Sequence, residues 1–138
     1  MIKTIDSGAK SHGQLILVVE DEPVIRFGIA LHLEENGFQV IEAESAAEAI
    51  AILQEPGPPV NLVFSDVRMP GELDGIGLSR WVFENRPNIA VILASGEFGK
   101  TNAVQDLGGA ETMTKPFDYG NLITRIHAAI NKKTPPTS

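Results

Sequence analysis

The sequence predicts a single α/β domain in which five parallel strands alternate with five helices that cover both faces of one sheet. Three observations lead to this prediction. Short apolar runs recur along the chain, as expected for strands buried on both faces. Amphipathic segments with helix start and stop signals separate these runs. Polar residues follow several runs directly, and parallel strands joined by right-handed crossovers would collect them at one edge of the sheet.

Composition restricts the kind of protein. The 138 residues suit one domain, and a hydrophobic content of 43% indicates a globular chain. A net charge of −7 argues against direct binding of nucleic acid, which needs a basic surface. The chain has no cysteine, no apolar run of about 20 residues and no signal-like segment in residues 1–12, so we expect a cytoplasmic protein without a membrane span. Residues 1–13 are predicted to be a flexible lead-in, 14–132 the domain and 133–138 a tail.

The first strand is expected at residues 15–19, and Pro23 then fits the first turn of a helix, where its missing N–H has no helical partner to lose. We expect this helix to end at Asn36-Gly37, a pair typical of a left-handed cap. Its apolar face is predicted to combine residues at four-residue spacing with two that widen it: Ile25, Ile29, Leu33, Phe27 and Leu31.

The second strand is expected at residues 38–43. Ser45 and Glu48 have the spacing of a capping box, in which each satisfies a backbone N–H of the other, and they predict the start of the second helix. The third strand is expected at residues 60–65 and ends at Asp66. An acidic residue at the carboxyl end of a buried strand lies where open α/β sheets bind their ligands.

The second half of the chain repeats this pattern. Asp74 is predicted to cap the third helix, and the fourth strand is expected at residues 89–94. A weaker helix is expected over residues 99–107, followed by a short strand at 110–114. Asp118 is predicted to cap the last helix, whose inward residues are expected to be Leu122, Ile123, Ile126 and Ile130.

The predicted edge of the sheet gathers Glu20, Asp21, Asp66, Ser95 and Lys115. Three carboxylates close together raise one another's pKa unless a cation lies among them. Oxygen ligands with room for water suit Mg²⁺ better than zinc. Asp66 is then a candidate nucleophile that forms an aspartyl phosphate, while the metal and Lys115 neutralise the phosphoryl oxygens and Ser95 donates to one of them.

Each of these residues also has a structural interpretation. Glu20 and Asp21 fit an ordinary acidic helix start, which the helix dipole favours. Asp66 fits a strand-end aspartate that caps the next turn. Ser95 fits a turn beside Gly96, and Lys115 fits a solvated surface position. The three histidines, His12, His32 and His127, show no ligand spacing and are interpreted as surface or packing residues. Trp81 is interpreted as a cover over part of the core.

Five short motifs at the predicted strand and helix ends resemble one known family. They are Leu-Val-Val-Glu-Asp-Glu-Pro (17–23), Asp-Val-Arg-Met-Pro-Gly (66–71), Asp-Gly (74–75), Ala-Ser-Gly (94–96) and Lys-Pro-Phe (115–117). Together they resemble the receiver domain of bacterial two-component response regulators, over residues 15 to about 131. The resemblance implies the flavodoxin-like strand order 2-1-3-4-5.

The resemblance also implies a role for each residue at the edge of the sheet. Asp66 is the expected phosphoacceptor, Asp21 a direct Mg²⁺ ligand and Glu20 a ligand through water. The third protein ligand is then the main-chain carbonyl of Arg68, and Asp66 also contacts the metal. Ser95 is the expected hydroxyl switch and Lys115 the phosphate-contacting lysine, followed by a cis peptide bond at Pro116.

The expected function is therefore that of a phosphorelay component without ordinary substrate turnover, and so not an enzyme. A sensor histidine kinase or a histidine phosphotransfer protein donates the phosphoryl group, and the domain then changes a protein-interaction surface. Output goes to a downstream protein or to an output domain elsewhere on a longer chain, or is absent if the domain is a phosphate sink.

Two departures from the family pattern affect these expectations. Thr112 stands where receivers usually carry an aromatic residue, so coupling to the signalling face (the helix over 99–107, the strand over 110–114 and the last helix) is expected to differ. Homodimerisation through that face is one option. The segment 69–75 is one residue longer than the commonest form, which predicts an enlarged loop.

Arg68 and Glu97 are predicted to flank the pocket mouth and, if paired, to slow dephosphorylation.

Two other functions are alternatives. A Mg²⁺-dependent phosphatase with an aspartyl-phosphate intermediate needs a second aspartate two residues after the nucleophile, where this chain has Arg68. A flavodoxin-like cofactor binder needs a glycine- or hydroxyl-rich phosphate loop after the first strand, where this chain has Glu-Asp-Glu-Pro.

Overall fold

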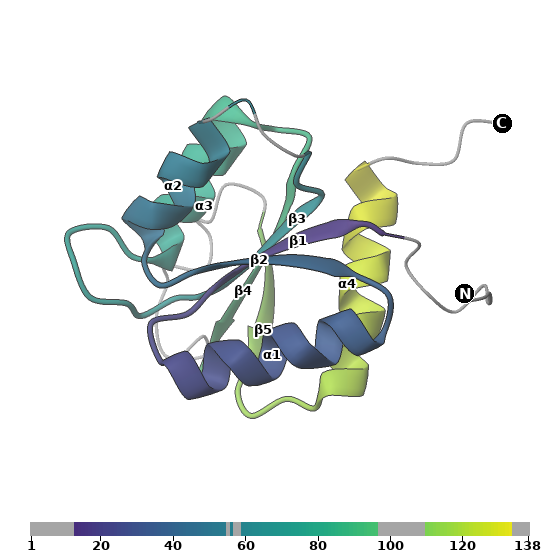
Figure 1. Cartoon of the computed structure of the whole chain (residues 1–138). Coiled ribbons are helices and arrows are strands. Elements are labelled where there is room, and N and C mark those ends of the chain that lie inside the picture. The colour runs from purple at the N-terminus through teal and green to yellow at the C-terminus, as the bar shows by residue number, and fades with distance from the viewer. Residues whose placement is uncertain (1–12, 55, 57–58, 97–109, 134–138) are drawn as a thin grey trace, which may run out of the picture.

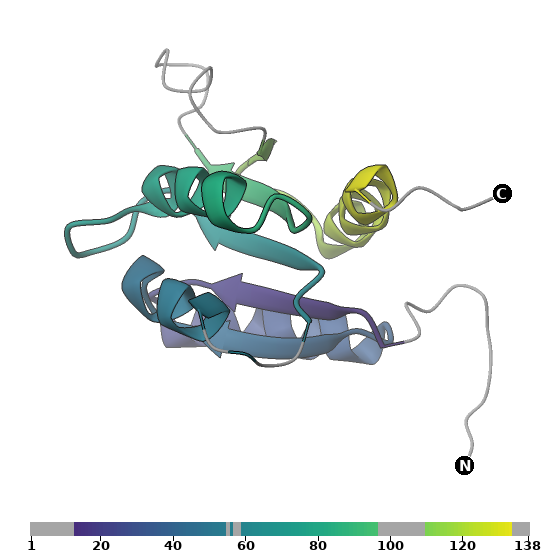
Figure 2. The same ribbon diagram turned by 90° about the horizontal axis from the view of Figure 1, so that it is seen from above.

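The computed structural model describes residues 13–54, 56, 59–96 and 110–133, and its centre is a five-stranded parallel sheet. Its strand order, β2-β1-β3-β4-β5, confirms the predicted fold class and the order that the family resemblance implied. From above, the strands extend from β2 at one edge of the molecule to β5 at the other (Figure 2). The strands are β1 (Leu15–Val19), β2 (Gln39–Ala43), β3 (Leu62–Asp66), β4 (Ala90–Ser95) and β5 (Glu111–Thr114).

Helices cover both faces of this sheet. They are α1 (Pro23–Glu35), α2 (Ala46–Gln54), α3 (Gly75–Asn85) and α4 (Tyr119–Lys133). Helices α1 and α4 lie on one face, and α2 and α3 on the other (Figure 1). The helix predicted over 99–107, the lead-in through residue 12 and the end of the tail lie outside the described residues. Within the described part of the chain, no helix is long and apolar enough to cross a membrane.

The helix caps follow the sequence signals with one difference. The Oδ1 atom of Asp74 accepts a hydrogen bond from the amide of Gly77 at 3.0 Å. The Oδ1 atom of Asp118 accepts one from the amide of Asn121 at 2.6 Å. The Ser45 hydroxyl accepts from the Glu48 amide at 3.0 Å, which is half of the predicted capping box. The Glu48 carboxylate, however, accepts from the amide of Glu44 at 2.7 Å, one residue before the expected partner. It still satisfies a backbone donor at the start of α2.

The core has one layer on each face of the sheet. The side chains of β1 and β3 alternate between a cluster under α1 and α4 and a cluster under α2 and α3, as the two-residue period of a strand requires. Trp81 packs against the second cluster, as predicted. The ring of His32 lies 4.6 Å from that of Tyr119, and His127 lies near a core phenylalanine, so both histidines contribute packing. His12 lies outside the described residues.

The prediction of which residues form the buried face of α1 is wrong in part. Ile29 and Leu33 are buried, but Phe27 is 65% exposed, Leu31 50% and Ile25 46%. At about 100° per residue, positions 27 and 31 lie on the side of the helix opposite positions 29 and 33. They therefore do not widen the buried face, but form part of a separate apolar surface that faces solvent.

Candidate functional site

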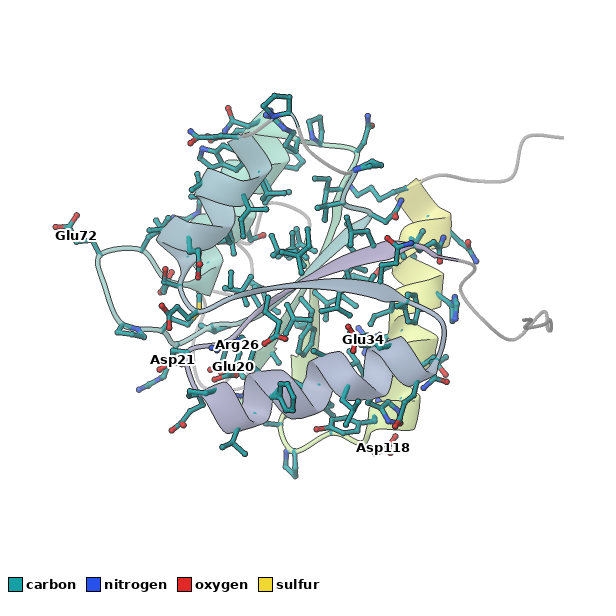
Figure 3. The ribbon with its side chains drawn as sticks, viewed as in Figure 1. Glu20, Asp21, Arg26, Glu34, Glu72 and Asp118 are labelled. Carbon is teal, nitrogen blue, oxygen red and sulfur yellow. The ribbon has the colours of Figure 1, made fainter. Side chains whose placement is uncertain are left out.

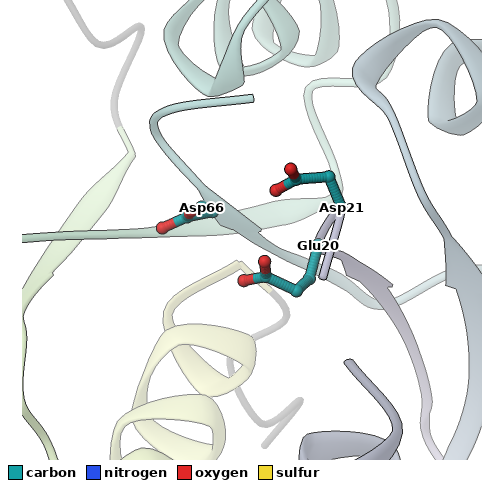
Figure 4. Close-up of side chains that lie close together, drawn as sticks. All are labelled: Glu20, Asp21 and Asp66. Atoms are coloured by element: carbon teal, nitrogen blue, oxygen red, sulfur yellow. The ribbon is translucent and has the colours of Figure 1, made fainter. Parts of the chain in front are cut away.

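The carboxyl ends of β1 and β3 bring three acidic side chains together. Val19 of β1 is in register with Ser65 of β3, so the residues that follow, Glu20 and Asp66, emerge from neighbouring strands. One carboxylate oxygen from each of Glu20, Asp21 and Asp66 lies within 4.8 Å of the others. Figure 4 shows the three side chains grouped at these strand ends. The predicted acidic cluster is therefore present.

Backbone and side-chain contacts hold Glu20 in place. Its amide donates to the carbonyl of Ala43 at 3.0 Å, and its Oε2 accepts from the amide of Glu22 at 3.0 Å. Arg26, one turn into α1, donates from Nη1 to the Glu20 carbonyl at 2.8 Å and pairs through Nε with Glu42 at 3.0 Å. Figure 3 shows Arg26 beside Glu20 near the start of α1. No local sequence signal indicates this positioning role of Arg26.

The electrostatics of Glu20 favour a cation at this cluster. Glu20 is only 5% exposed, and burial raises the pKa of its carboxyl above the ordinary value. The hydrogen bond from the Glu22 amide and the charge of Lys115 lower this pKa, whereas the charges of Asp66 and Asp21 raise it further. A buried carboxylate that is penalised in its charged form gains from a bound cation. The donor set, which consists of carboxylate oxygens, fits Mg²⁺.

We predict that Glu20→Gln stabilises the metal-free protein at neutral pH. In the folded state the raised pKa of Glu20 penalises its charged form, and this penalty is absent once the carboxyl is protonated. The gain in unfolding free energy should therefore grow as pH rises through the raised pKa of Glu20. Urea unfolding with a chelator at about pH 4 and about pH 8 measures it. An equal effect at both pH values would contradict this explanation.

Lys115 reaches the cluster from the end of β5, which is separated from β3 by β4. Its Nζ lies 2.5 Å from Oδ1 of Asp66, and its amide donates to the carbonyl of Ser95 at 2.9 Å. The Lys115–Pro116 peptide bond is cis, as the resemblance implied. This contact places an ammonium group directly on the carboxylate that was predicted to accept a phosphoryl group.

Ser95 ends β4 at the same edge of the sheet. Asp66 is in register with Ala94, so Ser95 follows the strand position directly beside Asp66. The residue is buried and is the last one of β4, next to the turn position that its structural interpretation gave it. Its role as a hydroxyl switch remains a prediction.

Arg68 lies on the loop between β3 and α3, with an exposed side chain. With Asp21 and Asp74 it lines a hollow of about 440 Å³ next to the acidic cluster. The same loop carries Glu72 away from the body of the molecule (Figure 3). Metal ligation by the Arg68 carbonyl remains a prediction, and the proposed pairing with Glu97 falls on a residue outside the described part of the chain.

A close backbone approach fixes the end of β3. The amide of Gly75 donates to the carbonyl of Val67 at 2.9 Å. A Cβ atom at Gly75 would collide with the carbonyl oxygen of Asp66 and press on the backbone of Val67. The glycine of the Asp-Gly motif therefore lets the start of α3 lie against the strand that carries Asp66.

A pocket of about 450 Å³ beside the cluster was not predicted. It lies between α1 and the segment that follows β5, and apolar residues form most of its wall. The lining residues are Glu20, Ile25, Ile29, Phe64, Asp66, Ala94, Lys115, Pro116, Phe117 and Tyr119. The apolar side chain of Ile25 and the aromatic residues after Lys115 could have suggested it, but only if their proximity had been known.

Sequence comparison decides the family. The sequence model of the response regulator receiver domain matches residues 16–127, which is most of the chain. The chain belongs to the response regulator receiver domain family. Members of this family are phosphorylated on an aspartate and bind Mg²⁺ at an acidic pocket, and the cluster of Glu20, Asp21 and Asp66 lies at the corresponding edge of the sheet.

Curated relatives place this receiver domain among longer proteins. It is 32% identical to a probable transcriptional regulatory protein of Picosynechococcus over 96% of this chain and 55% of that protein. It is 36% identical to the phosphate regulon transcriptional regulatory protein PhoB of Escherichia coli over 87% of this chain and 53% of that protein. The sensor kinase CckA of Brucella abortus matches 86% of this chain with only 13% of its own length, at 36% identity. This chain thus spans about half the length of the transcriptional regulators it matches.

Solved structures agree with the fold. A response regulator receiver domain protein from Clostridium thermocellum superposes with a TM-score of 0.79 at 34% identity, covering 87% of this chain and 96% of that one. The receiver domain of NtrX from Brucella abortus gives a TM-score of 0.74 at 33% identity, covering 84% and 98%.

Proposed function

We propose that this receiver domain accepts a phosphoryl group on Asp66 from a phosphohistidine, in a Mg²⁺-dependent reaction. The observation that carries the proposal is the convergence of groups on this carboxylate. Glu20 and Asp21 lie beside it, and the Nζ atom of Lys115 is in contact with Oδ1. A carboxylate that is both crowded by other acids and paired with a lysine is suited to bind a metal and a phosphoryl group together.

In the proposed reaction, a carboxylate oxygen of Asp66 attacks phosphorus. A P–O bond to Asp66 forms while the P–N bond to the donor imidazole breaks, and the imidazole nitrogen keeps the electron pair of that bond. Asp21 and Asp66 would hold Mg²⁺ directly, with Glu20 through water and the Arg68 carbonyl as a further ligand. When bound, the ion supplies positive charge that offsets the charge of the phosphoryl oxygens.

Two further side chains take part in this proposal. The ammonium group of Lys115, which contacts Asp66 before transfer, pairs with a phosphoryl oxygen afterwards. Ser95, at the end of the neighbouring strand, donates its hydroxyl to another of these oxygens. The movement of these two groups toward the phosphoryl group would start the change in the interaction surface.

The exposed apolar surface of α1 supports the proposal that the phosphoryl donor is a protein. Val24 is 83% exposed, and with Phe27 and Leu31 it forms an apolar stripe that the described part of the domain does not cover. Helix α1 begins two residues after Asp21, so the stripe starts next to the acidic cluster. A sensor histidine kinase or histidine phosphotransfer protein that docks on this stripe would bring its histidine to Asp66.

The output surface is proposed to include β5 and α4, together with the segment 99–107. In the described part of this face, Arg125 donates to the carbonyl of Thr112 at 2.9 Å, and both Arg125 and Lys132 pair with Glu111. These contacts tie α4 to the strand position where receivers usually carry an aromatic residue. The partner is a downstream protein, an output domain or a second copy; without any of these the domain would act as a phosphate sink.

We predict one Mg²⁺-dependent phosphoryl adduct per chain. Incubation with acetyl phosphate and Mg²⁺ should add the mass of a single phosphoryl group, and a chelator should prevent this addition. Intact-mass spectrometry, with phosphate release measured in parallel, tests the prediction. Steady release of phosphate from small phosphomonoesters with no adduct would instead favour the phosphatase alternative.

A further inference from the structure

The pocket beside Asp66 combines an apolar wall with charged groups at one end. Of its ten lining residues, only Glu20, Asp66 and Lys115 are charged. Its volume of about 450 Å³ lies within the range of small-molecule sites, roughly 300–1,000 Å³. Receiver chemistry at Asp66 uses the charged end, and leaves the apolar part without an assigned role.

Three aromatic side chains form part of the apolar wall. Phe64 and Phe117 meet edge to face at 83° with ring centroids 5.8 Å apart, and Tyr119 lines the pocket from the start of α4. Ile25 and Ile29 of α1 also line it. Aromatic rings attract organic cations through their negative faces, in addition to their apolar contact.

The charge at the end of the pocket also selects a cation. The ammonium of Lys115 is paired with Asp66, so its charge is offset within the site. Glu20 adds a buried carboxylate to the lining, and Asp21 lies beside it in the same cluster. An anionic ligand would meet this excess of negative charge, whereas an ammonium group complements it and can donate to carboxylate oxygens.

We propose that this pocket binds a small organic ammonium ion with an aromatic or branched apolar body. The apolar body packs among Ile25, Ile29 and the aromatic side chains. The ammonium group lies at the charged end, against the carboxylates of Glu20 and Asp66. A primary amine suits this end better than a quaternary one, because only the primary amine offers N–H donors to the carboxylates.

Such a ligand would compete with Mg²⁺, since both use the carboxylates of Glu20 and Asp66. Bound amine would therefore lower the rate at which Asp66 is phosphorylated, so this rate would depend on the concentration of the amine. That regulatory consequence rests on the proposed function of Asp66, whereas binding of the amine does not.

The test uses 2-phenylethylammonium chloride as the probe, with unphosphorylated protein and no phosphodonor. Calorimetry measures affinity, and two-dimensional NMR locates binding through the methyl groups of Ile25 and Ile29. The probe should bind at least about tenfold more tightly than neutral 2-phenylethanol and than ethylammonium, because it alone uses both ends of the pocket. Added Mg²⁺ should weaken its apparent affinity.

Two variants with the same added charge sharpen the test. Ile25→Lys places a cation on the pocket wall and should weaken probe binding by about tenfold or more. Val24→Lys places the same charge on the neighbouring residue, which is exposed and does not line the pocket, and should change affinity by less than about twofold. Circular dichroism checks that both variants remain folded.

Equal affinity for the probe and its neutral analogue, no effect of Mg²⁺, or equal effects of the two lysine variants would overturn the proposal. None of these results would affect phosphorylation of Asp66, which the adduct experiment tests separately. Conversely, probe binding to a protein that forms no adduct would retain the pocket as an amine site and reject the proposed function alone.

Discussion

Replacing Asp66 with asparagine should abolish the Mg²⁺-dependent phosphoryl adduct. Asparagine keeps the size of the side chain and one carbonyl oxygen, but the amide is not a nucleophile toward phosphorus and carries no charge for the metal or for Lys115. Intact mass after incubation with acetyl phosphate and Mg²⁺ should show no added phosphoryl group in this variant. Because the variant lacks the nucleophile itself, raising the Mg²⁺ concentration should not restore the adduct.

Asp118→Asn is the matched control for this substitution. It makes the same chemical change at a carboxylate that caps α4, and asparagine is also an effective capping residue. The adduct should form in this variant at close to the wild-type rate. An adduct of equal yield in Asp66→Asn would place the phosphoacceptor elsewhere.

Gly75→Ala should destabilise the domain by about 3 kcal/mol, as overpacking against a fixed backbone does. The added methyl group would press on the carbonyl of Asp66 and on Val67, and neither is the end of a flexible side chain that can move aside. Relief of this contact requires α3 to move away from β3, which would shift the strand end that carries Asp66. Urea unfolding measures the stability, and Mg²⁺ titration should show weaker binding.

Gly96→Ala provides a control for the loss of a glycine near the site. Among the described residues, a Cβ atom there meets no atom within 4 Å apart from its chain neighbours, so the change in unfolding free energy should stay within about 0.5 kcal/mol. If Gly75→Ala were equally mild, the close approach would not be what fixes the end of β3.

The strand ends could be predicted because the relevant signals are local. A continuous apolar run marks a strand buried on both faces, and the polar residue that ends it marks the edge of the sheet. Glu20, Asp66 and Lys115 were therefore brought together by pattern alone, once the strands were taken to be parallel. The caps at Asp74 and Asp118 were equally readable, because a capping side chain bonds within its own helical turn.

Features that depend on distant contacts could not be read in this way. The order of the strands came from the family resemblance, since no local pattern says which apolar run pairs with which. The spacing of Phe27 and Leu31 puts them on the opposite side of α1 from Ile29 and Leu33, but no local pattern says which of these two apolar sides the domain covers. The pocket between Ile25 and Phe117 joins residues more than ninety positions apart, and only the fold brings them together.

The most direct test of Asp66 as the phosphoacceptor is to locate the phosphoryl group in the wild-type protein. Reduction of an aspartyl phosphate with borohydride converts that one side chain to the alcohol of homoserine and releases phosphate, and tandem mass spectrometry then identifies the position. After treatment with acetyl phosphate and Mg²⁺, homoserine should be found at residue 66 and should be absent when a chelator replaces Mg²⁺. Homoserine at residue 21 or another acidic position, or an equal yield at residue 66 without the metal, would contradict the proposed site.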